Sequence, residues 1–218
     1  MTTRDAFHQE LREIDDAVLQ MAALVEQAIA RAMQALVRRD TRLADEVRAG
    51  DETVNELQRT IRSRCIAVMA RQAPVARDLR ELTTVQLVIN ELERMGDHAV
   101  GIAKQVERLR DEESLPEVGD LSALAALVQE QVRGGIEAFV DVNVQRAREL
   151  CVLDDAIDHR YKVIFATLLE QMRMDSRLVA AATSLLFVAH DLERIGDRVT
   201  NICEDVIYMV SGEIEELN

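Results

Sequence analysis

Two phrases in this sequence repeat the same charged residues, and both fall on predicted helices. "LERMGDHAVGIA" spans residues 92–103 and "LERIGDRVTNIC" spans residues 192–203, an offset of 100 residues. Each phrase contains a glutamate and, four residues later, an aspartate; these are Glu93, Asp97, Glu193 and Asp197. Four helical steps of about 100° return nearly to the starting direction, so the two carboxylates of a phrase share one helix face. Like charges at this spacing repel, and a bound cation would remove the repulsion.

A second pair of oxygen-bearing side chains precedes each phrase on the neighbouring predicted helix. The pairs are Asp51 with Asn55 and Asp154 with Asp158, again four residues apart and each next to apolar positions. Antiparallel neighbouring helices can therefore place two such residues opposite two others, which predicts a four-point oxygen site on the bundle surface. Oxygen ligands without thiolate or imidazole suit iron, manganese, magnesium or calcium, and zinc is less typical.

The two halves of the chain differ in how many oxygen ligands they offer. Asn201 and Glu204 extend the acidic stripe of the second phrase, whereas the corresponding residues of the first are Gly101 and Lys104. We therefore expect the metal site of the second half to be the better formed one. The alternative is that these residues are ordinary solvated charges, although the duplication of the whole pattern favours a site.

The histidines bear on a different hypothesis, a carboxylate metalloenzyme such as a di-iron oxidase, or a metal store. Ferritin-like proteins of this kind carry Glu-x-x-His pairs inside a four-helix bundle. The four histidines, His8, His98, His159 and His190, have no glutamate three residues before them. The sequence also contains no P-loop, glycine-rich phosphate cradle or serine-histidine-aspartate arrangement. We therefore expect a protein that is not an enzyme and keep the metalloenzyme as the alternative.

The elements that would hold these residues are long helices. The chain of 218 residues has two prolines, no tryptophan and 3% aromatic residues, a composition typical of packed helices. Apolar residues at alternating steps of three and four form six stripes. The stripes run through residues 7–35, 43–69, 82–106, 121–143, 144–172 and 178–209. They predict an all-α protein of two tandem, similar three-helix bundles, residues 1–112 and 120–218, joined by a linker at 113–119.

Charge and cysteine usage limit the partners and the compartment. The formal net charge of −14 argues against nucleic-acid binding, which depends on lysine and arginine, and favours metal cations or basic protein surfaces. The cysteines, Cys65, Cys151 and Cys203, form no CxxC pair, so neither a disulfide framework nor a zinc ribbon is indicated. The N-terminus is too charged for a signal peptide, and the most apolar run is interrupted by polar residues. We expect a soluble cytoplasmic protein.

The sequence resembles the PhoU family over essentially the whole chain. The features that carry the resemblance are the two phrases, the pairs that precede them, the two three-helix halves and "RQAPVARDLR" at residues 71–80. The resemblance implies that the repeated motifs hold multinuclear metal clusters, in that family iron or other metals, on the bundle surface. Gly101 departs from the asparagine expected there, so the first site has one ligand fewer than the family pattern. The residues to which this role transfers are Glu93, Asp97, Glu193 and Asp197, with Asp51, Asn55, Asp154, Asp158 and Asn201 as co-ligands.

The resemblance also implies partners that no pattern in the residues reveals. It implies a cytoplasmic homodimer that links the ATPase of a phosphate ABC transporter to a phosphate sensor histidine kinase and reaches the membrane only through these partners. It implies negative regulation of the phosphate-starvation response when phosphate is plentiful.

Overall fold

Six long helices account for almost all of the protein in the computed structural model, which describes residues 3–112, 115 and 117–217. The described part of the chain contains no strand, so the all-α prediction is confirmed. A short 3₁₀ helix, η1, precedes the last long helix. The elements are α1 (Thr3–Arg38), α2 (Thr41–Gln72), α3 (Arg77–Arg108), α4 (Glu117–Val140), α5 (Val144–Met174), η1 (Ser176–Leu178) and α6 (Val179–Ser211).

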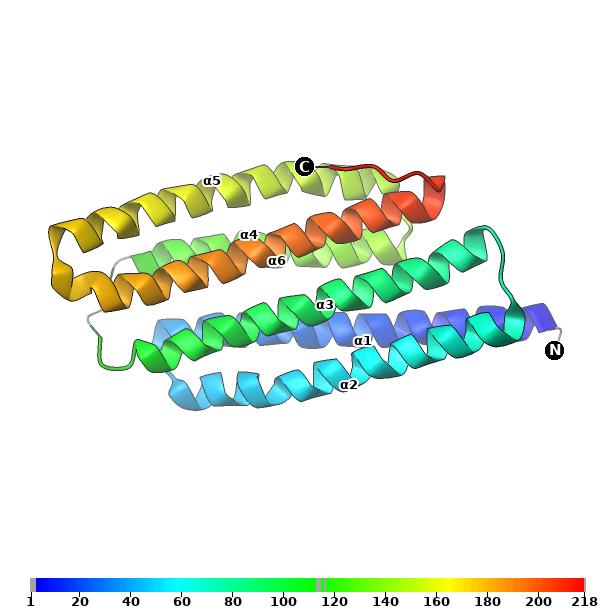
Figure 1. The fold of residues 1–218 in the computed structure, drawn as a ribbon, viewed down its shortest axis with the longest axis horizontal. Helices are drawn as coiled ribbons and strands as arrows, with labels where there is room; N and C mark the ends of the chain where they lie inside the picture. Colours follow the sequence, from blue (N-terminus) through cyan, green and yellow to red (C-terminus); the bar gives the residue numbers. More distant parts are fainter. Residues whose placement is uncertain (1–2, 113–114, 116, 218) are drawn as a thin grey trace.

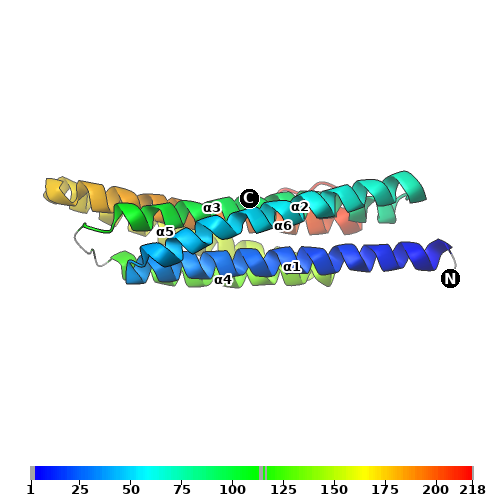
Figure 2. The same ribbon diagram turned by 90° about the horizontal axis from the view of Figure 1, so that it is seen from below.

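The helices form two layers that run along the length of the molecule. Helices α2, α3, α6 and α5 lie side by side in one layer, and α1 and α4 lie behind them (Figures 1 and 2). The first half packs α1 against both α2 and α3, and the second packs α4 against both α5 and α6. The two three-helix halves meet chiefly where α3 lies antiparallel to α6 at the centre of the layer. We call this contact the α3–α6 seam.

The apolar stripes of all six helices face a shared core. Leu92 and Leu192, the first residues of the two repeated phrases, are both 0% exposed. Complete burial of a leucine side chain stabilises a fold by about 1.5–3 kcal/mol. Because the leucine fixes the rotation of its helix, the glutamate that follows it lies at the edge of the core, half-buried rather than fully solvated.

The sequence predicts the end of the second helix correctly but not the end of the fourth. Pro74 predicts the end of the second helix, and α2 does end at Gln72, with Ala73 in the left-handed region at φ 45°. The fourth helix was expected to reach Asn143, but it ends at Val140. Asn143 instead begins the next helix, because its side chain accepts a hydrogen bond of 3.0 Å from the backbone N–H of Arg146, as N-cap residues do.

The start of the second half also differs from the expectation. The fourth helix was predicted to begin near residue 121, with the preceding 113–119 as linker, but α4 begins at Glu117. Glu117 and Asp120 lie in its first turn, where negative charge is favourable near the helix N-terminus. Residues 113, 114 and 116 of the predicted linker lie outside the described residues.

Two further observations concern the cysteines and the apolar character of the helices. All three cysteines are free thiols; Cys65 and Cys203 are buried and Cys151 is half-buried. Within the described ranges, no helix combines the length and the apolar character that crossing a membrane requires.

Candidate functional site

Three of the predicted ligands in the second half come together between α5 and α6. One carboxylate oxygen each from Asp158, Glu193 and Asp197 lies within 4.8 Å of the others. Burial, and next the charge of Asp197, raises the pKa of Glu193 to about 6. Its Oε2 atom is buried without a hydrogen-bond partner. We call these three residues the carboxylate triad; its negative charges lie close enough to repel one another.

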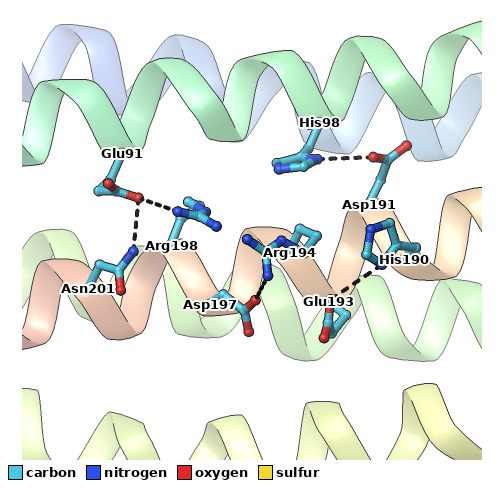
Figure 3. Close-up of polar contacts among 9 residues, drawn as sticks. All are labelled: Glu91, His98, His190, Asp191, Glu193, Arg194, Asp197, Arg198 and Asn201. Carbon is cyan, nitrogen blue, oxygen red and sulfur yellow. Dashed lines mark hydrogen bonds and ion pairs between the residues drawn. The ribbon is translucent and has the colours of Figure 1, made fainter. Parts of the chain in front are cut away.

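Basic side chains at the margin supply part of the missing positive charge. Arg194 donates a hydrogen bond of 2.6 Å to Asp197, and Lys162 donates one of 3.0 Å to Asp158. The Nδ1 atom of His190 lies 3.6 Å from Oε2 of Glu193. Figure 3 shows Arg194 and His190 beside the acids of α6. Each member of the triad therefore has one basic neighbour.

Asp154, the remaining acidic residue predicted on α5, is held by a different partner. Gln131 of α4 donates a hydrogen bond of 3.0 Å to Oδ1 of Asp154. Gln131 is fully buried, and sequence analysis missed it. The signal was present: it is a polar residue between Val128 and Val132 in an otherwise apolar stripe. Asp154 is thus tied to α4 and lies outside the carboxylate triad, next to it along α5.

The first half brings its predicted ligands near one another more loosely. Burial raises the pKa of Glu93, followed by repulsion from Asp97 and Asp51. Asn55 donates a hydrogen bond of 2.9 Å to Asp51. Asp97 is exposed, whereas its counterpart Asp197 is half-buried. Within the described part of the chain, only the second half gathers three carboxylate oxygens at metal-binding separation.

The glycine inside each phrase lets the preceding helix approach the phrase closely. A methyl group added at Gly96 would lie 3.4 Å from Oδ1 of Asp51, and one at Gly196 would lie 3.3 Å from Oδ1 of Asp154. Glycine within a helix costs about 1 kcal/mol relative to alanine. The aspartate of the preceding helix therefore lies against the glycine in both halves, and Gly196 is the more crowded position because Oε1 of Gln131 would lie 3.1 Å from the added methyl group.

The structure does not bring Asn201 to the carboxylate triad. Asn201 follows Glu193 by eight residues, which rotates its side chain by about 80° around the helix relative to Glu193. The side chain of Asn201 therefore points toward α3. There Asn201 donates a hydrogen bond of 3.2 Å to Glu91. Glu204, the other residue expected to extend the stripe, accepts a hydrogen bond of 2.9 Å from the backbone N–H of Leu217. The difference between Asn201 and Gly101 therefore concerns the α3–α6 seam.

The α3–α6 seam repeats one polar contact about an approximate two-fold axis. Glu91 of α3 accepts hydrogen bonds from Arg198 at 3.3 Å and from Asn201 at 3.2 Å. One hundred residues later, Asp191 of α6 lies 3.0 Å from Nδ1 of His98 and lies against Gly101. His98 and Gly101 are the counterparts of Arg198 and Asn201. Figure 3 shows both contacts crossing between the two helices.

Asp205, also on α6, should make stability depend on pH. Burial, then repulsion from Glu91 and Glu204, raises its pKa from 3.8 to about 7. A folded pKa above the unfolded pKa means that the folded state binds more protons between about pH 4 and pH 7, so stability falls as pH rises through that window. Between pH 5 and pH 8 we expect the unfolding free energy of the metal-free wild-type protein to fall by about 2 kcal/mol more than that of the Asp205→Asn variant. This figure is discounted for partial solvent screening.

Urea unfolding at the two pH values measures this difference. Asp141→Asn, at an exposed position just after α4, serves as the control and should keep the pH dependence of the wild-type protein. The assignment to Asp205 is wrong if Asp205→Asn and Asp141→Asn lose equal stability between pH 5 and pH 8.

Comparison with known proteins assigns the two halves to one domain type. The family model described as PhoU domain matches residues 18–106 and residues 121–206, one match in each three-helix half. The chain belongs to the PhoU family. Family membership confirms the resemblance that the repeated phrases predicted.

Members of the PhoU family match this chain over almost its whole length. The phosphate-specific transport system accessory protein PhoU homolog of Clostridium acetobutylicum is 37% identical over 99% of this chain and 99% of its own length. The homolog from Pseudomonas aeruginosa is 32% identical over 94% of this chain and 86% of its own length.

Solved PhoU structures share the fold as well. The crystal structure of PhoU from Pseudomonas aeruginosa has a TM-score of 0.91 at 32% identity, covering 95% of this chain and 100% of that chain. The phosphate transport system regulatory protein PhoU from Streptococcus pneumoniae also has a TM-score of 0.91, at 28% identity, covering 97% and 100%. The tandem bundle is thus the PhoU fold.

Proposed function

We propose that this protein is a metal-binding adaptor that modulates phosphate transport and keeps the phosphate-starvation response off while phosphate is plentiful. The observation that carries the proposal is the match of the PhoU domain to both halves. Relatives that match over almost the whole chain are named phosphate-specific transport system accessory proteins, and one solved relative is titled a regulatory protein. The role is that of a regulator that binds partners and carries out no catalysis.

The carboxylate triad supports the metal-binding part of the proposal. Its donor set is all oxygen, and the buried Oε2 of Glu193 has no hydrogen-bond partner, so the residues fit a hard or borderline cation. Iron is the metal we favour, with manganese, magnesium, calcium or zinc as alternatives. A bound ion would neutralise the repulsion and join α5 to α6. Asp51, Asn55, Glu93 and Asp97 would form the weaker site of the first half, with Asp154 beside the stronger one.

Partner binding is proposed to use exposed apolar positions along the long helices. The partners are the ATPase of a phosphate ABC transporter and a phosphate sensor histidine kinase, bound in the cytoplasm by a homodimer of this chain. Apolar side chains at matching positions of the two halves support such contacts: Leu87 is 43% exposed and Phe187 is 49% exposed. A specific complex buries about 800 Å² on each partner, which faces of this length can provide.

The metal-dependent oxidase or store remains the alternative function. Ligands in such proteins project into the bundle core, whereas the side chain of Asp158 is 39% exposed and that of Asp197 is 29% exposed. The partial exposure of the triad favours the adaptor. An oxygen-consumption assay with Fe²⁺ separates the two functions, because turnover of iron would establish an enzymatic activity.

Deletion of the gene tests the regulatory role. We expect phosphate-uptake genes to be expressed in phosphate-rich medium in the deletion strain, because an adaptor acts by shifting the populations of its partners' states. Reporter-gene activity in rich and poor medium measures the effect, and re-expression of the wild-type chain is the control. Unchanged expression, together with no cross-linking to the transporter ATPase or the sensor kinase, would refute the proposed function.

A further inference from the structure

The arginines of the two repeated phrases occupy the same place in the repeat and make opposite contacts. Arg194 turns toward the C-terminal end of its helix and donates a hydrogen bond of 2.6 Å to Asp197, a member of the carboxylate triad. Arg94 turns toward the N-terminal end and lies 3.4 Å from Glu91, at the α3–α6 seam. The difference is one of conformation, because both arginines follow a glutamate and precede an aspartate by three residues.

The contact of Arg194 uses an oxygen that a cation would need. Its guanidinium is bonded to Oδ2 of Asp197, so a metal ion and this guanidinium compete for one carboxylate. The side chain of Arg194 is 37% exposed, so the core does not enclose it. Asp97 in the first half lacks this competitor, because Arg94 donates to Glu91.

The carboxylate of Asp191 lies on the other side of Arg194 from Asp197. Asp191 precedes Arg194 by three residues, the same separation as between Arg94 and Glu91, and residues three apart are neighbours on a helix surface. Asp191 already faces the α3–α6 seam, where it contacts His98 at 3.0 Å. Arg48 makes the corresponding contact in this protein, 3.0 Å from the carboxylate of Asp45 three residues before it, so Asp191 is within reach of Arg194. Figure 3 shows Arg194 with Asp197 on one side and Asp191 on the other.

We propose that Arg194 is a built-in counter-ion of the second metal site, which leaves Asp197 for Asp191 when a divalent cation binds to the carboxylate triad. The inference rests on the metal binding proposed above and adds how that binding is transmitted. A cation bound between α5 and α6 then changes the contact between Asp191 of α6 and His98 of α3, because the guanidinium of Arg194 now also binds Asp191. The second site is thereby coupled to the junction of the two halves, whereas in the first half Arg94 already occupies the equivalent position.

Removal of the competing arginine tests the displacement. With the first site disabled by Glu93→Gln and Asp97→Asn, we expect Arg194→Gln to tighten Mn²⁺ binding about fivefold, since it abolishes a short, partly screened ion pair that must break. Arg94→Gln is the matched control, measured with Glu193→Gln and Asp197→Asn disabling the second site. It removes the same charge at the same place in the repeat and should tighten Mn²⁺ binding by less than about twofold. The electron paramagnetic resonance of free Mn²⁺ reports the affinities.

A double-mutant cycle tests the transfer to Asp191. Asp191→Asn keeps an oxygen for His98 but weakens the new partner of Arg194, so it should loosen Mn²⁺ binding about threefold when Arg194 is present. In the Arg194→Gln background the same substitution should change Mn²⁺ affinity by less than about 1.5-fold. The difference between the backgrounds isolates the contact, because the long-range effect of the lost charge is common to both.

Each negative result has a distinct meaning. Equal tightening by Arg194→Gln and Arg94→Gln would overturn the displacement, and an equal effect of Asp191→Asn in both backgrounds would overturn the transfer. Either result would leave metal binding itself in place. Failure of the wild-type protein to bind either Mn²⁺ or Fe²⁺ would instead refute both the metal-binding function and the inference that depends on it.

Discussion

Replacing Glu193 and Asp197 together with alanine is expected to abolish metal binding in the second half and to remove more bound metal than the same change at Glu93 and Asp97. The second pair belongs to a group of three carboxylates whose oxygens lie within 4.8 Å of one another. Removing a residue that only hydrogen-bonds to a metal ligand typically costs about 10–100-fold in metal affinity, so loss of two ligands should cost at least about 100-fold. Elemental analysis after dialysis against a limiting chelator measures the metal retained by each double variant.

The variant that replaces Glu193 and Asp197 with alanine should not lose stability, although it loses metal affinity. Burial and the charge of Asp197 raise the pKa of Glu193 to about 6, so the charged glutamate is disfavoured in the metal-free fold. The alanine variant should therefore be as stable as the wild-type protein, or more stable by up to about 1 kcal/mol, at pH 7. Thermal unfolding of the metal-free proteins provides this control. Equal metal loss from the two double variants would contradict the asymmetry between the halves.

Gly135→Val is expected to cost about 3 kcal/mol of unfolding free energy, because overpacking at a close helix contact forces the backbone or the neighbouring side chains to move. A methyl group added at Gly135 would lie 2.6 Å from Cγ1 of Val199. Val199 is 1% exposed and its side chain is stiff, so it has little room to move. The contact joins α4 to α6 directly behind the second phrase. Urea unfolding of the metal-free protein measures the loss.

Gly50→Val is the matched control, since it introduces the same side chain in a helix. A methyl group added at Gly50 has no neighbour within 4 Å. Valine has a higher helix propensity than glycine, so this variant should be stabilised by about 0.3–0.5 kcal/mol. If both variants shift stability equally, close packing of α4 on α6 is not what requires glycine at residue 135.

The sequence alone determined the helical fold and the position of the acids on their helices. Apolar residues at steps of three and four bury one face of each helix, and this periodicity needs no tertiary information. Leu92 and Leu192 fix the rotation of α3 and α6, so the glutamate after each one had to lie at the edge of the core. Repetition of the phrase also predicted the equivalence of the two halves, which the matching contacts of Gly96 and Gly196 bear out.

The partners of the polar side chains that reach from one helix to another were decided only by tertiary packing. Helical periodicity gives the direction in which Asn201 points but not which helix lies there, so its hydrogen bond to Glu91 required the antiparallel pairing of α3 with α6. Gln131 reads in sequence as an interruption of an apolar stripe, and only the approach of α4 to α5 gives it Asp154 as a partner. Arg94 and Arg194 share one sequence context and both pair within their own helix, Arg94 with the residue three before it and Arg194 with the residue three after it, so the sequence left both partners open. Polar contacts between helices depend on the relative positions that the helices adopt in the fold, and local sequence does not encode those positions.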